Sequence, residues 1–400
     1  MTEAVRVVIV GAGPAGLAAG IASADGGAVL LEKNAMSGRK FLLSGSGQCN
    51  VTHGGPMDDF VVHFGDKRKA RFVTPALFAF DNRATVRYFE ECGVPMWERD
   101  DGKIFPGSLK SETLLGALLA DFTNRGGTLR TETAVEAVRK IDGGFLVETS
   151  RESFRAEKLI VSTGGCSFPK TGSGGDGFRF AESFGHRIVS PRPALTPVYV
   201  RDFPFTDCSG IAFRQVKTEI VRNGKPFRAG RGDVLLTHHG LSGPGILDLS
   251  RGIEPGDELR VVVCPNAGNL STFLTGKKIL KNALSSLELP ERFLVRLLET
   301  LKVPPDKPVA EVNREERKRL ETALTGLPFV VEKLGGWNEA MATAGGVALD
   351  EVNRQTMESR LAPGLFFCGE VLDIDGDTGG YNIQFAISSG MLAGRSTLGR

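Results

Sequence analysis

Three glycines and one carboxylate near the start of the chain have the spacing of a phosphate-binding turn. Gly11, Gly13 and Gly16 follow the β-branched run 7–10, and Glu32 ends a second apolar run about 20 residues later. The first glycine allows a tight turn, the second lets a pyrophosphate approach the backbone, and the third lets a helix pack close to the strand. An acid at position 32 can accept hydrogen bonds from ribose hydroxyls. The stretch predicts a βαβ unit that binds either NAD or FAD.

A second group of residues, near the other end of the chain, favours FAD. Gly369 and Glu370 end the short apolar run 365–368, and Gly379 and Gly380 open an Ala/Ile/Met-rich helix expected over 383–393. The acid can bind ribityl hydroxyls. The free N–H groups at the start of the helix suit the ring edge where a reduced flavin carries negative charge. The alternative is an ordinary loop between a strand and a helix.

The loops between these two groups carry positive charge and bare backbone. Lys33, Arg39 and Lys40 precede Ser44 in the glycine-rich stretch 44–47, which could cradle phosphates or line a reactive ring. A mobile surface loop is the alternative. The expected strand 158–162 is followed by two small residues, Thr163 and Gly164. Small residues suit a place where the backbone passes near a cofactor. The basic run 65–71 is expected to be a solvated face.

Composition limits the class of protein. Four hundred residues exceed one hydrophobic core, so two or three domains are expected. A formal net charge of +2 is too balanced to imply a nucleic-acid partner, and none is expected. The six cysteines form no CxxC pair, which removes the main support for a zinc ribbon or a dithiol oxidoreductase, and no metal site is predicted. No apolar run is long enough to span a membrane, so we expect a soluble cytoplasmic protein with reduced thiols; its oligomeric state stays open.

Periodicity divides the chain into three parts. Residues 1–191 and 341–400 read as a Rossmann-type α/β domain built from both chain ends. Residues 192–272 and 326–340 alternate apolar and polar positions, with a hairpin signal at Asn223-Gly224, and read as a β-rich insert. Residues 273–325 read as a helical subdomain, with charges outside and Leu and Phe inside.

Six motifs, in order, resemble the flavoprotein family labelled BaiN-like, YhiN-like or aminoacetone oxidase family FAD-binding enzyme. They are GAGPAGLAAG, GRKFLLSGSGQCNVT, STGGCSFPKTGSGGDGF, LLTHHGLSGPGIL, TAGGV and FFCGEVLDIDGDTGGYNIQFAISSG. The resemblance implies a two-dinucleotide-binding FAD domain, a β-barrel-like insert and a small helical domain.

The resemblance also implies roles for individual residues. Those implied for the pyrophosphate are Gly11, Gly13, Ala15 and Gly16. Those implied for the adenosine are Glu32, Lys33 and the backbone of Val135. Those implied near the phosphates or isoalloxazine are Arg39, Lys40, Ser44, Cys49 and Asn50. Those implied near the ribityl chain and pyrimidine ring are Gly369, Glu370, Asn382 and Ile383. Gln48 stands where the family usually has Arg, which weakens any expectation of a fixed positive charge there.

The expected function is that of an FAD-dependent oxidoreductase acting on an unknown small molecule. Hydride transfer passes through flavin N5, with the substrate expected between the FAD domain and the insert. A reductase of an activated C=C bond is the leading reading, on the strength of the resemblance. Since only one GxGxxG occurs, NAD(P)H would enter transiently as the reductant. The alternatives are an amine oxidase or dehydrogenase, and an RNA-modifying or non-catalytic flavin-binding module.

Three side chains are candidates for chemistry beyond the cofactor's own. His238 is the candidate acid or base because histidine titrates nearest neutrality, with a structural turn histidine as the alternative. Cys49 and Cys166 lie beside glycine loops and could be redox-active with the flavin. We favour the interpretation that both are small packed residues, since neither has a cysteine partner nearby in sequence.

Overall fold

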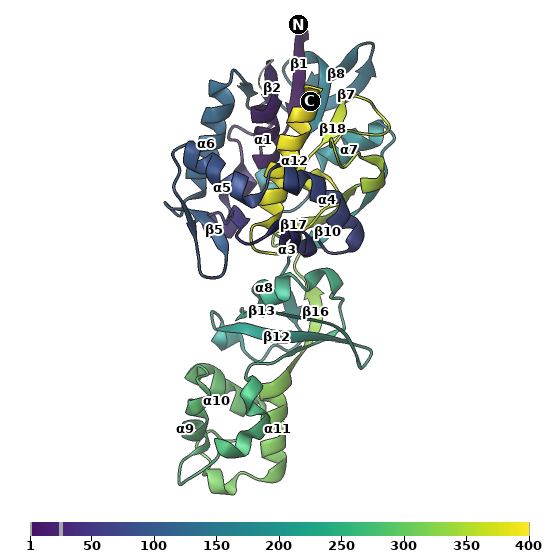
Figure 1. Cartoon of the computed structure of the whole chain (residues 1–400). Coiled ribbons are helices and arrows are strands. Elements are labelled where there is room, and N and C mark those ends of the chain that lie inside the picture. The colour runs from purple at the N-terminus through teal and green to yellow at the C-terminus, as the bar shows by residue number, and fades with distance from the viewer. Residues whose placement is uncertain (1, 24–26, 400) are drawn as a thin grey trace. The chain divides into compact units, whose positions relative to one another are not determined.

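The computed structural model describes residues 2–23 and 27–399 and divides into two compact units (Figure 1). The first unit is Met1–Ala194 with Met341–Arg400, and the second is Leu195–Ala340. The first is a parallel-sheet α/β unit built from both chain ends, and the second contains a closed β-barrel. The predicted fold class is therefore confirmed.

A seven-stranded sheet forms the centre of the first unit, in the order β6-β2-β1-β9-β8-β7, with β18 also paired to β9. Its strands are β1 (Thr2–Val10), β2 (Ala28–Leu31), β6 (Thr128–Arg130), β7 (Val135–Ile141), β8 (Gly144–Thr149), β9 (Ser153–Val161) and β18 (Leu365–Phe367). Helix α1 (Pro14–Ser23) joins β1 to the parallel β2, as predicted for the first βαβ unit. Residues 7–10 of β1 pair with β2 on one edge and β9 on the other, and their side chains are buried in the core that α1 and α12 share.

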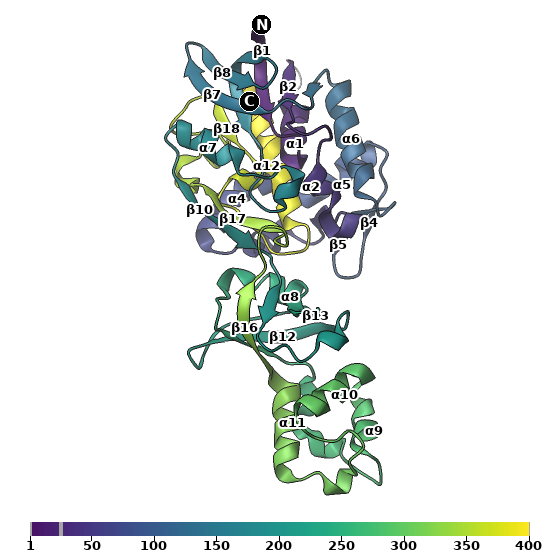
Figure 2. The ribbon, with the colours of Figure 1, turned by 180° about the vertical axis from the view of Figure 1, so that it is seen from behind.

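The last helix, α12 (Tyr381–Thr397), packs directly on α1 (Figures 1 and 2). A Cβ atom on Gly390 would lie 2.2 Å from the carbonyl oxygen of Ala15, and one on Gly394 would lie 2.3 Å from that of Ala19. Glycine at these two positions lets the helix backbones touch. The N-terminal and C-terminal segments consequently share one core.

Shorter elements surround this sheet. The helices are α2 (Arg39–Leu42), α3 (Met57–Val61), α4 (Lys67–Ala79), α5 (Asn82–Glu91), α6 (Ser111–Asn124) and α7 (Asp176–Ser183). The strands are β3 (Thr52–His53), β4 (Met96–Glu98) and β5 (Lys103–Pro106) in one small sheet, and β10 (Ile188–Ala194) with β17 (Ala342–Val347) in another.

The basic run 65–71 is largely exposed, as the sequence predicted, with Lys69 as the exception. It begins α4, and Lys69, whose side chain is only 14% exposed, lies 2.6 Å from Asp375 and 3.1 Å from Asp373. Arg68 contacts Asp373 at 2.7 Å. Both carboxylates are buried, so these cations are held by charges that would otherwise lie unpaired in the interior.

The second unit is a six-stranded closed barrel with helices attached (Figure 2). Its strands, in barrel order, are β11 (Val198–Val200), β14 (Gly240–Ser242), β13 (Lys225–Leu236), β12 (Ala212–Arg222), β15 (Glu258–Val261) and β16 (Leu327–Leu334). Its helices are α8 (Pro244–Leu247), α9 (Leu280–Leu284), α10 (Glu291–Thr300) and α11 (Arg314–Gly326). Asn223 and Gly224 both have positive φ and form the predicted hairpin turn.

One hydrophobic core joins the barrel to these helices. Phe205, Phe293 of α10 and Phe329 of β16 pack together, with ring centroids 5.2 and 5.9 Å from that of Phe205. The division of this unit into separate β-rich and helical parts stays a prediction.

Replacing Gly390 with alanine should lower the stability of the first unit. The new methyl group meets the backbone of α1 at 2.2 Å, and forced overpacking of this kind costs about 1–3 kcal/mol. Gly116→Ala is the matched control, because Gly116 is also helical and a Cβ there meets nothing within 4 Å. Thermal unfolding should show a lower midpoint for Gly390→Ala and an unchanged or higher midpoint for Gly116→Ala. Equal midpoints in the two variants would contradict the close helix contact.

Candidate functional site

Gly11, Gly13 and Gly16 of the first turn differ in what a side chain at each position would meet. Gly11 has φ 103°, and a Cβ there would lie 2.7 Å from the carbonyl oxygen of Ser162. A Cβ on Gly16 would lie 2.0 Å from the carbonyl oxygen of Gly11. A Cβ on Gly13, by contrast, would meet nothing within 4 Å. Packing therefore requires two of the glycines, while the third leaves open space at the start of α1, where helix N–H groups suit an anion.

The Glu32 side chain is hydrogen-bonded to the glycine turn 11–16. One carboxylate oxygen accepts the N–H of Ala12 at 3.1 Å, and the other accepts the backbone N–H of Asn34 at 2.9 Å and its side-chain amide at 2.7 Å. The Thr133 N–H donates to the Glu32 carbonyl at 2.9 Å, which brings the start of β7, and so Val135, to the same end of the sheet. The carboxylate is thereby fixed beside the glycine turn.

Lys33, expected beside Glu32, and Arg39, expected near the phosphates or isoalloxazine, have partners of their own. Arg39 donates to the Asn34 side-chain oxygen at 3.0 Å and so joins the group around Glu32. Lys33 instead forms an ion pair with Asp176 at the start of α7, at 2.5 Å. Asp176 had no role in the sequence analysis, although it lies in one of the six motifs.

Two predicted residues from opposite ends of the chain meet in an ion pair. The Lys40 ammonium lies 2.6 Å from Glu370 and also donates to the hydroxyl of Ser167. Ser167 donates to the other Glu370 oxygen at 3.2 Å, and that oxygen accepts the N–H of Thr343 at 2.7 Å. The side chains of Lys40 and Glu370 are a quarter and a fifth exposed, so both remain accessible to a ligand.

Ser167 and Thr343 are site residues that the sequence analysis missed. The Thr343 hydroxyl accepts the N–H of Cys166 at 2.8 Å, and a Cβ on Gly165 would lie 2.3 Å from it. Thr343 therefore connects β17 to the loop that follows β9. Both residues stand inside motifs already singled out, in STGGCSFPK and TAGGV, and that position was the available signal.

Two residues of the predicted cofactor loops carry buried polar atoms without a hydrogen-bond partner in the described part of the chain. Within residues 2–23 and 27–399, the side-chain oxygens of Asn50 and Thr163 are buried without a hydrogen-bond partner. Cys49, which precedes Asn50, has φ 55° and donates its backbone N–H to the Ser44 carbonyl at 3.0 Å. Gly164 has φ 74°. The orphaned oxygen of Asn50 is costly unless a ligand or water satisfies it, which fits a polar ligand such as FAD. The Thr163 hydroxyl instead lies against α7, because a Cβ on Gly177 would lie 2.3 Å from it.

The start of α12 closes the other side of the predicted site. Gly380 has φ 96°, and a Cβ there would lie 2.7 Å from the backbone of Thr52, so only glycine fits. The Asn382 side chain accepts the N–H of Gly376 at 2.8 Å and donates to its carbonyl at 3.0 Å. Asn382 thus ties the preceding loop to the helix. Ile383 is half-buried in the first turn.

A stack of three rings adjoins this helix start and was not predicted. The Tyr381 ring lies between His63, at 4.1 Å between centroids, and His53, at 5.5 Å, with interplanar angles of 20° and 15°. His63 Nδ1 lies 3.0 Å from Asp377. The stack holds Tyr381 in a fixed orientation beside Gly380.

His238 belongs to the second unit, unlike the residues above. It is exposed in the turn between β13 and β14, next to His239, whose ring stacks on Tyr199. Its role as an acid or base stays a prediction, as do the cofactor contacts of the individual residues named above.

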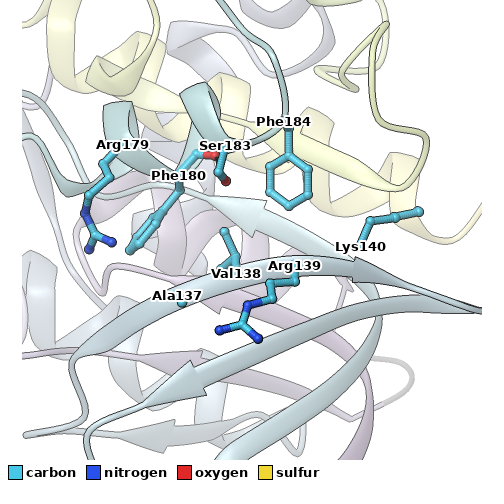
Figure 3. A pocket seen from close by; sticks show the side chains of 8 residues that line it. All are labelled: Ala137, Val138, Arg139, Lys140, Arg179, Phe180, Ser183 and Phe184. Atoms are coloured by element: carbon cyan, nitrogen blue, oxygen red, sulfur yellow. Dashed lines mark hydrogen bonds between the residues drawn. The ribbon is translucent and has the colours of Figure 1, made fainter.

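A separate hollow of about 400 Å³ lies between β7 and α7 (Figure 3). Its eight lining residues include none of the predicted cofactor residues. Arg179 on its rim donates to the Glu136 carbonyl at 2.6 Å, and Arg139 is paired with Glu148 at 2.9 Å. The hollow therefore offers apolar surface and cations that already have partners.

None of the helices described is long and apolar enough to cross a lipid bilayer. Residues 2–23 and 27–399 contain no group of three or more His, Cys, Asp or Glu side chains that could hold a metal ion.

Comparison with known proteins gives matches over the full length. The family described as HI0933-like protein Rossmann domain matches residues 5–396. A ribosomal RNA dihydrouridine synthase of Escherichia coli is 33% identical, over 97% of this chain and 96% of its own. A 3-dehydro-bile acid delta(4,6)-reductase of Clostridium scindens is 30% identical, over 99% of both chains. Among solved structures, a 3-ketosteroid-delta4-(5alpha)-dehydrogenase of Rhodococcus jostii is 16% identical with a TM-score of 0.52, covering 99% of this chain and 97% of its own, which shows a shared fold.

Gly13→Val should separate cofactor binding from folding. The open space beside Gly13 means that the valine leaves the protein fold intact but occupies the place where a pyrophosphate would approach. We expect the Kd for FAD to rise at least about tenfold, the equivalent of about 1.4 kcal/mol, with an unchanged melting temperature of the cofactor-free protein. Gly16→Val, whose side chain meets backbone at 2.0 Å, should instead lower that melting temperature. Normal FAD binding by Gly13→Val would contradict the site.

Cys49 should behave as an inert thiol. Burial raises its pKa to about 12, so at pH 8 only about one molecule in 10,000 carries the thiolate that reacts with iodoacetamide. Native protein should leave Cys49 unmodified from pH 7 to 9, as measured by mass spectrometry of its peptides, whereas urea-unfolded protein should be alkylated at Cys49. Rapid alkylation in the native state, rising with pH near neutrality, would show that the thiol is reactive after all.

Proposed function

The chain belongs to the HI0933-like Rossmann family, and we propose that it reduces a C=C bond conjugated to a carbonyl group, with NAD(P)H as the reductant. Membership confirms the resemblance seen in the sequence and places the chain among FAD-dependent oxidoreductase enzymes. The reductant and the substrate belong to the proposal.

One observation carries the proposal. Two relatives that match nearly the whole chain have different substrates, but both names describe the addition of hydrogen to a carbon–carbon double bond. A delta(4,6)-reductase adds hydrogen across carbon–carbon double bonds, and a dihydrouridine synthase makes a uridine with two added hydrogens. In a 3-keto steroid diene and in uracil alike, the double bond is conjugated to a carbonyl. Such a bond accepts a hydride at its β-carbon and a proton at its α-carbon. An amine oxidase, the other enzyme class considered, has no counterpart among these names.

The residues of the first unit support the proposal by what they can hold. FAD, when bound, supplies the hydride-transfer chemistry. Gly13 and the start of α1 would receive its pyrophosphate, and Glu32 its adenosine ribose. Lys40 and Glu370 would exchange part of their mutual ion pair for ribityl and phosphate contacts. The N–H groups at the start of α12 would stabilise negative charge on the ring.

A second candidate substrate is uridine within RNA. The specific observation in its favour is the relative named as a ribosomal RNA dihydrouridine synthase, which matches 97% of this chain. The near-balanced charge of the sequence instead favoured a small-molecule substrate and no nucleic-acid partner. The two candidates share the bond chemistry and differ in what must dock beside the cofactor.

Anaerobic flavin spectroscopy tests the reaction. We expect NADPH or NADH to bleach the flavin absorbance of the FAD-loaded protein, and an added conjugated enone or uridine-containing RNA to restore it without oxygen. Reduced RNA should gain the mass of two hydrogens per uridine.

Gly13→Val provides the matched control, because it should keep the fold while losing FAD. Bleaching by amines, with recovery only on admission of oxygen, would instead indicate an amine oxidase.

A further inference from the structure

The tip of the β12–β13 hairpin carries several positive charges, although the net charge of the whole chain is only +2. Residues 222–231 read RNGKPFRAGR, with four cations and no acid. The side chains from Asn223 to Ala229 are all exposed, as is Arg231. This ten-residue stretch is called the basic tip below.

Three of its cations have no carboxylate partner within the part of the chain that the structure describes. Arg231 donates only to the Gln215 carbonyl at 2.9 Å, and Lys225 and Arg228 form no ion pair there. Arg214, on the same hairpin, shows the contrast, because Asp233 neutralises it at 2.6 Å. The basic tip therefore carries a net field that favours an anionic partner.

An exposed aromatic ring lies among these cations. Phe227 is 54% exposed, although a phenylalanine gains most from burial. The Arg222 guanidinium lies 4.2 Å from the ring centroid. It is itself held by two carboxylates, Asp257 at 2.9 Å and the exposed Glu254 at 3.0 Å, and by the Gly252 carbonyl at 2.8 Å. One side of the ring is thus held in place while much of the ring stays open to solvent.

We propose that the basic tip binds single-stranded RNA, with Lys225, Arg228 and Arg231 on the phosphates and Phe227 stacked on an unpaired base. Cations that follow a backbone, interleaved with an aromatic platform, are the two parts of a single-strand site. A duplex offers no free base face, so the ring points to a single strand or loop. The inference rests on the RNA candidate of the proposed function and assigns it a docking surface. An acidic protein or an anionic membrane would also be attracted by the positive charge. Neither would explain why the Phe227 ring is fixed and exposed.

Binding of a fluorescent 12-nucleotide oligouridine RNA to the full-length FAD-loaded protein tests this surface. The triple variant Lys225→Gln/Arg228→Gln/Arg231→Gln should weaken binding at least about tenfold at 100 mM salt. It should also lower the slope of log K against log salt by about 2, since each lost phosphate contact removes about 0.7. Phe227→Ala should weaken binding by about fivefold or more with the slope unchanged, because it removes stacking and no charge.

The matched control removes three exposed charges elsewhere in the same unit, as Lys277→Gln/Lys278→Gln/Lys318→Gln. It should bind RNA as the unaltered protein does. Equal weakening by the two triple variants, no RNA binding by the unaltered protein, or binding to phosphatidylserine vesicles in place of RNA would each overturn the proposal. NAD(P)H bleaching of the flavin, measured on the same samples, fails only if the proposed reductase activity is wrong, so the two failures are distinguishable.

Discussion

The direct contact between the backbones of α1 and α12 is the constraint on which the first unit depends. Glycines at 390 and 394 remove the side chains that would keep the helices apart. The contact fixes α12 in position, and with it the glycine pair that opens the helix. It also fixes the loop carrying Glu370, because Gly369 lies against Ala15, with only 2.8 Å between the Ala15 methyl and a Cβ placed on the glycine. The meeting of Glu370 with Lys40 is a consequence of this packing.

Charge then fixes the loop between β18 and α12. Asp373 and Asp375 are buried, and each needs a cation because a carboxylate loses its hydration in the interior. Lys69 and Arg68 supply it from the start of α4. The loop is therefore held at Asn382 by hydrogen bonds and at α4 by ion pairs. A site that must present helix N–H groups to a ligand gains from such fixed surroundings, because little reorganisation remains to be made on binding.

Much of this arrangement could be predicted from the sequence, for reasons that are local. The spacing of Gly11, Gly13 and Gly16 needs only a strand before it and a helix after it, and Asn223-Gly224 specifies its turn through two residues with positive φ. The partners of Lys69 could not be predicted, since they lie about 300 residues away along the chain. Ser167 and Thr343 were missed for the same reason, because neither residue has a chemical signal until Glu370 is placed beside it. The net charge of +2 averages over segments as different as the basic tip and the acidic loop before α12, so it could reveal neither of them.

Building one unit from both ends of the chain has a consequence for its synthesis. While residues 195–340 are being made, β9 lacks its partner β18, and α1 lacks the helix that covers it. Apolar surface of the first unit is then open to solvent, which is the condition in which partly made proteins aggregate or engage chaperones. The second unit, continuous in sequence, has every strand of its barrel available earlier. The first unit is therefore complete only once β18 and α12 have been made, and chains that end before residue 365 would lack both elements.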